Sequence, residues 1–66
     1  MILENPQPGD RVHWRAINRD YTGTVELVDE KRGALVAVDG GDYVIISTAS
    51  SMAALKKRYE SKSVQV

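Results

Sequence analysis

The sequence predicts an all-β fold in which five short strands curl into a small barrel, with a short helical turn before the last strand. Two observations predict this fold. Polar and apolar residues alternate with a period of two from Arg11 to Ala16, which is typical of a strand with one buried face. Further runs rich in valine and isoleucine follow, and glycine-containing or charged turns separate them.

The first predicted strand spans residues 10–16. Its alternation places Trp14 toward the core with Val12 and Ala16, and turns Arg11, His13 and Arg15 outward. Trp14 is the largest apolar side chain that such a barrel can bury. Two prolines interrupt the preceding residues, so residues 1–8 are expected to form an N-terminal arm.

The polar sequence Asn18-Arg19-Asp20 predicts the first turn, with Tyr21 packed beneath it. A second strand is expected to begin at Gly23, with Val25 and Leu27 on one shared face. A charged turn that ends in glycine covers residues 29–33, and residues 34–39 form the third strand.

The sequence Asp39-Gly40-Gly41-Asp42 predicts a tight hairpin, because glycine readily adopts the positive φ angles that such turns require. The fourth strand follows at residues 43–47, and residues 48–54 suit a helical turn. Residues 55–59 then fit a fifth strand, or they prolong the helix with Met52, Leu55 and Tyr59 along one face. We favour the strand, which gives a barrel over residues 9–60 and a flexible C-terminal tail over residues 61–66.

The composition limits what the chain can do. Its 66 residues allow one small core, and the absence of cysteine excludes disulfides and thiolate metal sites. The formal net charge is zero, which argues against strong general affinity for nucleic acid or anionic membranes. No apolar run reaches the roughly 18 residues of a membrane span. We therefore expect a soluble cytoplasmic protein with no membrane partner.

The sequence contains no motif that indicates an enzyme active site. There is no Gly-x-Gly-x-x-Gly sequence to hold a dinucleotide, and the single histidine has no cysteine to activate. A metal site from His13 with Asp10 and Asp20 is conceivable, but a solvated strand histidine is the favoured interpretation. The sequence therefore predicts no catalytic residue, no metal and no cofactor.

A binding surface is predicted on the first strand. Arg11, His13 and Arg15, here called the basic strip, offer hydrogen-bond donors on one face. Together with Tyr43 or Tyr59, the basic strip would suit a protein partner with acidic groups or the phosphates and bases of a nucleic acid.

Adjacent aliphatic residues predict self-association. Ile45 and Ile46 point to opposite faces of one strand, so one of them leaves the core, and the same holds for Leu35 against Val36. A second copy would bury such outward side chains. We therefore expect a homo-oligomer whose interface includes Leu35, Ile45 and Ile46.

Short motifs resemble known families. The sequences GDRV at 9–12 and TGTV at 22–25, with the valine-rich hairpin, are similar to KOW-type and other SH3-like modules, which implies a five-stranded SH3-like barrel. The ordered series GDRV, YTGTV, VAV, YVII and MAAL resembles the plasmid-borne type II dihydrofolate reductases over residues 9 to about 55. In that family, SH3-like barrels form a homotetramer around one central active-site pore.

The resemblance places Val44-Ile45-Ile46-Ser47 at the family's catalytic Val-Gln-Ile-Tyr, without its glutamine and tyrosine. It also places Trp14 at a lysine that supports ligand binding and Tyr21 at an interface tryptophan. We predict a non-enzymatic interaction module that binds protein or nucleic acid and self-associates. The alternative is a homotetrameric pore enzyme of the reductase type that binds NADPH. A structural accessory protein, carried on a mobile element as the reductase relatives are, is a third alternative.

Overall fold

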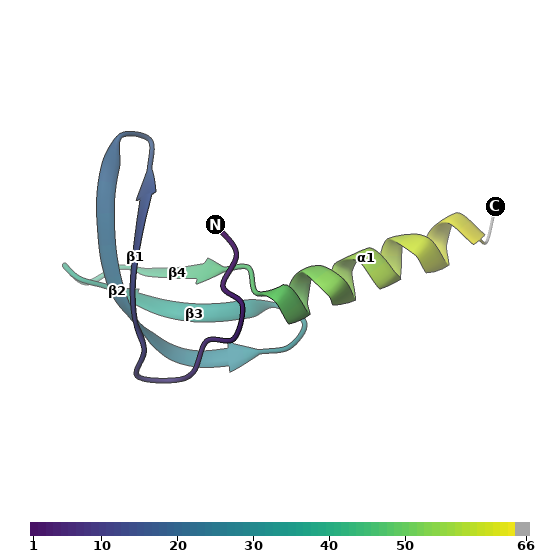
Figure 1. Cartoon of the computed structure of the whole chain (residues 1–66), viewed down its shortest axis with the longest axis horizontal. Helices are drawn as coiled ribbons and strands as arrows, with labels where there is room; N and C mark the ends of the chain where they lie inside the picture. Colours follow the sequence, from purple (N-terminus) through teal and green to yellow (C-terminus); the bar gives the residue numbers. More distant parts are fainter. Residues whose placement is uncertain (65–66) are drawn as a thin grey trace.

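Four antiparallel strands form one open sheet within residues 1–64, and a helix follows them (Figure 1). This computed structural model describes the backbone of residues 1–64 and the side chains of residues 1–58. Each strand pairs with the next one along the chain, so the sheet order equals the chain order. The predicted strand-rich architecture is confirmed. The elements are β1 (Arg11–Ala16), β2 (Arg19–Asp29), β3 (Gly33–Val38), β4 (Tyr43–Ile46) and α1 (Ala49–Val64).

Strand β1 has the predicted alternation. Val12 and Trp14 are half-buried and pack against the core, whereas Arg11, His13 and Arg15 are exposed. The Trp14 ring also stacks on Tyr21, its direct partner on β2, with the ring centroids 5.5 Å apart and the planes at 16°. Trp14 therefore joins the β1–β2 hairpin to the rest of the core.

A two-residue turn at Ile17 and Asn18 connects β1 to β2. Their φ angles are 50° and 61°, the positive values of a type I′ hairpin turn. Strand β2 thus begins at Arg19, not at Gly23 as expected from the sequence. Asn18 was correctly placed in the turn, but the polar residues after it pair with β1 and belong to the strand.

Strand β2 is long and irregular, and its side chains do not all point to the faces that the sequence predicted. Its first half pairs with β1 and its second half with β3, and the pairing shifts between Val25 and Leu27. Glu26 is the extra residue, so Val25 and Leu27 point to opposite faces. Val25 lies in the core at 1% exposure, and Leu27 is 54% exposed. The expectation of a shared face was wrong because alternation assumes regular pairing.

The turn at Asp39–Asp42 between β3 and β4 is confirmed. Gly40 and Gly41 have φ angles of 107° and 112°, and Val38 N donates to Asp42 O at 2.7 Å to close the hairpin. This hairpin brings β4 against β3 and completes the core. Its buried residues are Val25, Ala34, Val36 and Ile46, with Leu3, Val12, Trp14 and Val44 packed against them.

The fifth strand predicted at residues 55–59 was wrong, because these residues belong to helix α1. Thr48 and Ser51 cap its start: Ser51 N donates to Thr48 Oγ1 at 3.0 Å, and Thr48 N donates to Ser51 Oγ at 2.8 Å. The following residues are mostly good helix formers, with no glycine or proline to end the helix. No helix in the described part of the chain is long and apolar enough to cross a membrane.

The sheet does not close into a barrel. Residues 1–64 contain no fifth strand, and Leu3 of the N-terminal arm lies beside the end of β4 instead. Leu3 N donates to Ser47 O, and Ala49 N donates to Leu3 O, both at 2.9 Å. The β1–β2 hairpin rises steeply from β3 and β4, and α1 projects away from the sheet (Figure 1). The domain boundaries expected near residues 8 and 60 stay predictions.

Candidate functional site

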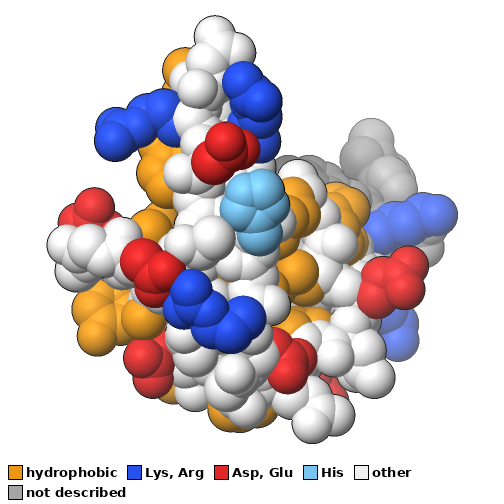
Figure 2. All heavy atoms as spheres, turned by 60° about the vertical axis from the view of Figure 1, so that its left-hand side comes forward, with side chains coloured by type: hydrophobic (Ala, Val, Ile, Leu, Met, Phe, Trp, Pro, Cys, Tyr) orange, Lys and Arg blue, Asp and Glu red, His pale blue; other side chains and the backbone are white. Residues whose placement is uncertain are grey.

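The basic strip lies on the outer face of β1. Its three residues point to one side, and the register sets them opposite Thr24, Thr22 and Asp20 of β2. In Figure 2 basic side chains, carboxylates and the histidine share this face of the molecule. The structure thus gathers the three predicted residues but places acidic groups among them.

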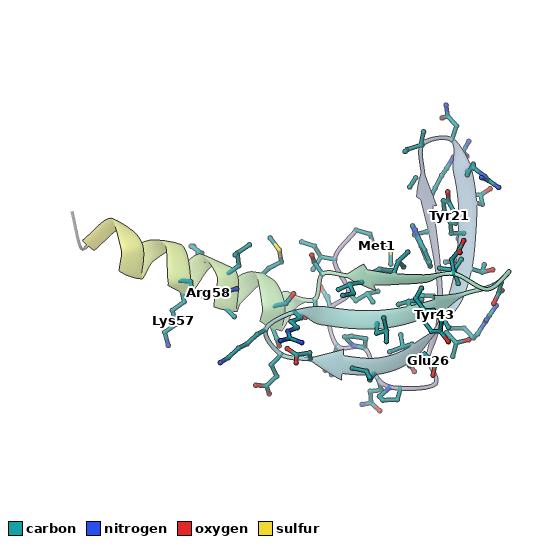
Figure 3. All side chains as sticks on the ribbon, turned by 180° about the vertical axis from the view of Figure 1, so that it is seen from behind. Met1, Tyr21, Glu26, Tyr43, Lys57 and Arg58 are labelled. Carbon is teal, nitrogen blue, oxygen red and sulfur yellow. The ribbon has the colours of Figure 1, made fainter. Side chains whose placement is uncertain are left out.

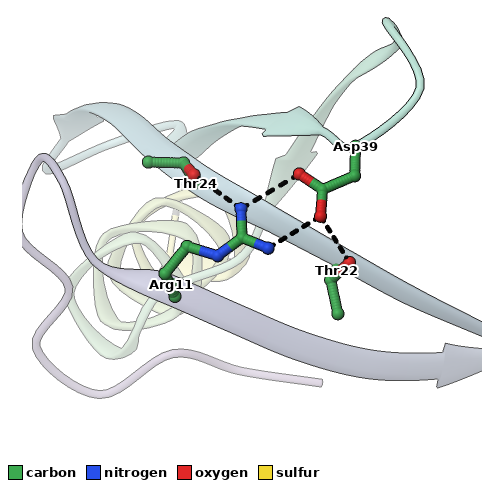
Figure 4. A network of polar contacts seen from close by, with 4 residues as sticks. All are labelled: Arg11, Thr22, Thr24 and Asp39. Atoms are coloured by element: carbon green, nitrogen blue, oxygen red, sulfur yellow. Dashed lines mark hydrogen bonds and ion pairs between the residues drawn. The ribbon is translucent and has the colours of Figure 1, made fainter.

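Arg11 is the centre of a polar network (Figure 4). Its Nη1 and Nη2 donate to Asp39 Oδ1 and Oδ2 at 3.0 and 2.7 Å, and Nη1 also donates to Thr24 Oγ1 at 2.9 Å. Thr22 Oγ1 donates to Asp39 Oδ2 at 2.7 Å. This is a bidentate contact, in which two parallel N–H groups of the guanidinium meet the two oxygens of the carboxylate. It favours the charged forms of both Arg11 and Asp39.

The same contacts shift both pKa values. The hydrogen bonds from Arg11 and then Thr22 hold the pKa of Asp39 well below its usual range, and the hydrogen bond to Asp39 raises the pKa of Arg11. Both side chains stay more than half exposed, so solvent weakens the attraction between them. Arg11 is therefore one half of an ion pair with no net charge.

A second carboxylate faces the histidine. His13 Nε2 lies 3.7 Å from Asp20 Oδ1, and both side chains are 64% exposed. The charges on this face are thus Arg11 and Arg15 against Asp20 and Asp39. The face has a mixed charge and lacks the continuous positive surface that phosphate binding uses.

The two candidate tyrosines belong to different elements, β4 and α1. Tyr43 begins β4 and is 64% exposed, and the register puts it in one row with Ala37, Thr24 and Arg11. At about 4.8 Å per strand, Tyr43 lies roughly 14 Å from Arg11 in this row. Tyr59 belongs to α1, and its side chain lies outside the described residues.

The clearest exposed apolar feature crosses the outer face of the sheet. Leu27, Leu35 and Ile45 are direct partners on β2, β3 and β4, and we call them the apolar row. Leu27 and Ile45 are 54% and 64% exposed, and Leu35 is half-buried between them. The predicted interface residues Leu35 and Ile45 thus share one surface. The prediction that Ile46 also belongs to the interface was wrong. Alternation along β4 turns Ile46 into the core, where it is 9% exposed.

Charged groups flank the apolar row. Asp29 and Arg32 line a shallow hollow of about 190 Å³ with the three aliphatic side chains and Gly33. Asp29 Oδ1 accepts hydrogen bonds from the backbone N–H groups of Lys31 and Arg32 at 2.8 and 2.9 Å, and these bonds lower the pKa of Asp29. The row therefore has both an anion and a cation at one end.

Sequence reasoning missed Leu27 and Asp39 as members of these surfaces. Leu27 is outward only because β2 shifts its pairing at Glu26, and Asp39 meets Arg11 across 28 positions of the chain. The described residues contain no group of three or more side chains placed to hold a metal ion. The chain shows no significant match to any protein-family model, curated protein or solved structure.

Proposed function

We propose that this chain is a small, non-enzymatic interaction module that assembles with copies of itself through the apolar row and binds a protein partner. The observation that carries the proposal is the apolar row, in which three aliphatic side chains on neighbouring strands cross the outer face of the sheet. Isolated exposed aliphatics are ordinary on a protein surface, but an aligned set is typical of an interface.

A second copy is the partner that suits the row. A two-fold interface joins a surface to itself, so the aliphatic side chains of one copy would pack on those of the other. The flanking charges fit the same arrangement, because Arg32 of one copy would face the Asp29 carboxylate of the other. A stable interface buries about 800 Å² per subunit, so it would extend beyond the row onto this flank.

The choice of protein over nucleic acid as the further partner follows from the charges on β1. Arg11 is already paired with Asp39, and His13 lies near Asp20. A phosphate chain approaching this face would meet two carboxylates, which repel it. Protein partners offer both signs of charge and suit a mixed surface better.

The resemblance to type II dihydrofolate reductases supports assembly but not catalysis. If the resemblance holds, Ile45 stands at the position of the family's catalytic glutamine, and Ser47 at the position of its tyrosine. An exposed isoleucine at that position favours packing between subunits over contact with a polar cofactor. If the chain were instead a pore enzyme, NADPH would quench Trp14 fluorescence saturably, and we expect no such change.

The test replaces Ile45 with lysine and measures sedimentation velocity over a range of concentrations. Wild type should sediment as a dimer or larger assembly at high concentration, and Ile45→Lys should shift it to the monomer, because a charge would be buried at the interface. The matched control is Ile17→Lys: Ile17 is 95% exposed at the hairpin turn, away from the row. A monomeric wild type, or equal assembly of both variants, would refute the proposal.

A further inference from the structure

A hollow of about 460 Å³ lies on the side of the sheet where the β1–β2 hairpin meets β4. Figure 3 shows Tyr21 on the rising hairpin and Tyr43 at the start of β4, near the foot of that hairpin. The volume is within the range of small-ligand sites. The lining residues are Trp14, Ala16, Tyr21, Val38, Asp42, Tyr43 and Val44.

The lining has a distinct chemistry. Three of its residues are aromatic, and Asp42 alone among the described lining residues carries a formal charge at neutral pH. Aromatic faces attract cations through their electron-rich π systems, and a carboxylate adds a direct charge attraction. The guanidinium of Arg19 already lies 5.9 Å from the centre of the Tyr21 ring, outside the hollow. The Tyr21 ring therefore already contacts one cation within the chain.

We propose that this hollow binds the side-chain ammonium group of a protein partner. The inference rests on the proposed function, for which it names the chemistry of the partner. A purely apolar partner would bury Asp42 without a counter-charge, which is costly. A nucleic acid could stack its bases on the rings, but its phosphates would approach the same carboxylate.

The hollow and the apolar row are made of different residues. The row and its flank use Leu27, Leu35, Ile45, Asp29 and Arg32, and none of these lines the hollow. Assembly and ligand binding can therefore be disrupted one at a time.

The experiment uses Trp14, the single tryptophan of the chain, as the reporter. A blocked Gly-Lys-Gly tripeptide with a trimethylated lysine is titrated into the full chain while the Trp14 emission is recorded. We expect a saturable change in Trp14 emission. The matching peptide that carries neutral norleucine should bind about twofold to fivefold more weakly. Equal binding of the two peptides, or no binding of either, would overturn the inference.

Substitutions in the hollow identify the groups responsible. Asp42→Asn and Tyr43→Leu should each weaken binding of the trimethyl-lysine peptide by about twofold to fivefold. Tyr43→Phe keeps the aromatic face and should bind like wild type, as should Glu30→Gln, which removes a carboxylate from the β2–β3 turn. All three replaced residues are exposed, so the variants should fold. If Asp42→Asn and Tyr43→Leu bind the peptide with wild-type affinity, the peptide binds elsewhere and the proposal is contradicted.

Two further measurements separate the possible failures. The Ile45→Lys variant should bind the peptide with wild-type affinity: if it does while wild type proves monomeric, the proposed assembly fails and the hollow stands. If wild type assembles but the peptides do not discriminate, the hollow fails and assembly stands. The second measurement titrates a single-stranded oligothymidine and follows the Trp14 emission. If the oligothymidine binds with higher affinity than the peptide, the hollow is a nucleic-acid site and the inference is overturned.

Discussion

Arg11 ties three parts of the fold together with one side chain. It extends from β1 and donates hydrogen bonds to Thr24 on β2. Its Nη1 and Nη2 also donate to Asp39, which directly follows β3. Thr22 supports the same carboxylate from β2. Because the planar guanidinium matches a carboxylate in both shape and charge, the contact links the β1–β2 hairpin to the β3–β4 turn.

The Arg11–Asp39 pair should make stability depend on pH. The pKa of Asp39 is lowered in the folded chain, so the pair stabilises the fold above the ordinary aspartate pKa, near 3.8, and this contribution is lost as the pH falls below it. Urea denaturation from pH 6 to pH 2 should therefore show a steeper loss for wild type than for Asp39→Asn. Part of the slope should persist, because the pKa of Asp29 is lowered too. Equal slopes for wild type and Asp39→Asn would contradict this role.

The strands depend on glycines at their ends for two separate reasons. Gly33 and Gly41 have similar positive φ angles, 116° and 112°, which side chains rarely adopt. A Cβ on Gly33 would also lie 2.5 Å from Ile46 O of β4, whereas a Cβ on Gly41 would meet open space. Gly33 therefore serves both the turn and the close pairing of β3 with β4.

The pair Gly33→Ala and Gly41→Ala separates these two effects. Gly41→Ala should lower the free energy of unfolding by about 1–2 kcal/mol, through backbone strain alone. Gly33→Ala should cost about 1–3 kcal/mol more, because β4 must shift to admit the methyl group. Urea denaturation of both variants measures the difference. Equal destabilisation would show that the contact with Ile46 relaxes without cost.

Local patterns predicted the elements whose pairing is regular. The alternation of β1, the charged turn before Gly33 and the Gly40-Gly41 hairpin all follow from neighbouring residues. Two of the errors have local causes that compete with such patterns. Glu26 shifts the pairing of β2, and the reciprocal cap of Thr48 and Ser51 favours a helix where alternation from Leu55 to Tyr59 also fits a strand.

At the scale of the whole molecule, the candidate surfaces come from residues that are distant in the chain. The apolar row joins three strands, and the aromatic hollow joins a hairpin to the turn before β4. The sequence predicted that one residue of each adjacent pair, Ile45 or Ile46 and Leu35 or Val36, points away from the core, but it did not say which. It could not predict Leu27 beside them, Asp39 against Arg11, or Trp14 stacked on Tyr21, because each contact requires the pairing register.

The two surfaces are built from different residues of a thin molecule. Its extents are 46 × 26 × 18 Å, and the sheet has one layer whose outer face carries the apolar row. A second copy on that face would turn the single layer into two, which is how sheets of this size usually bury both faces. The hollow shares no residue with the row, so we expect it to stay available to a different partner.

The most direct test of the central claim records methyl NMR signals with a soluble paramagnetic probe at low and high protein concentration. We expect the methyl groups of Leu27, Leu35 and Ile45 to lose their exposure to the probe at high concentration, while Ile17 stays exposed at both. Persistent exposure of the apolar row at high concentration, or protection confined to other surfaces, would show that the row is not the interface.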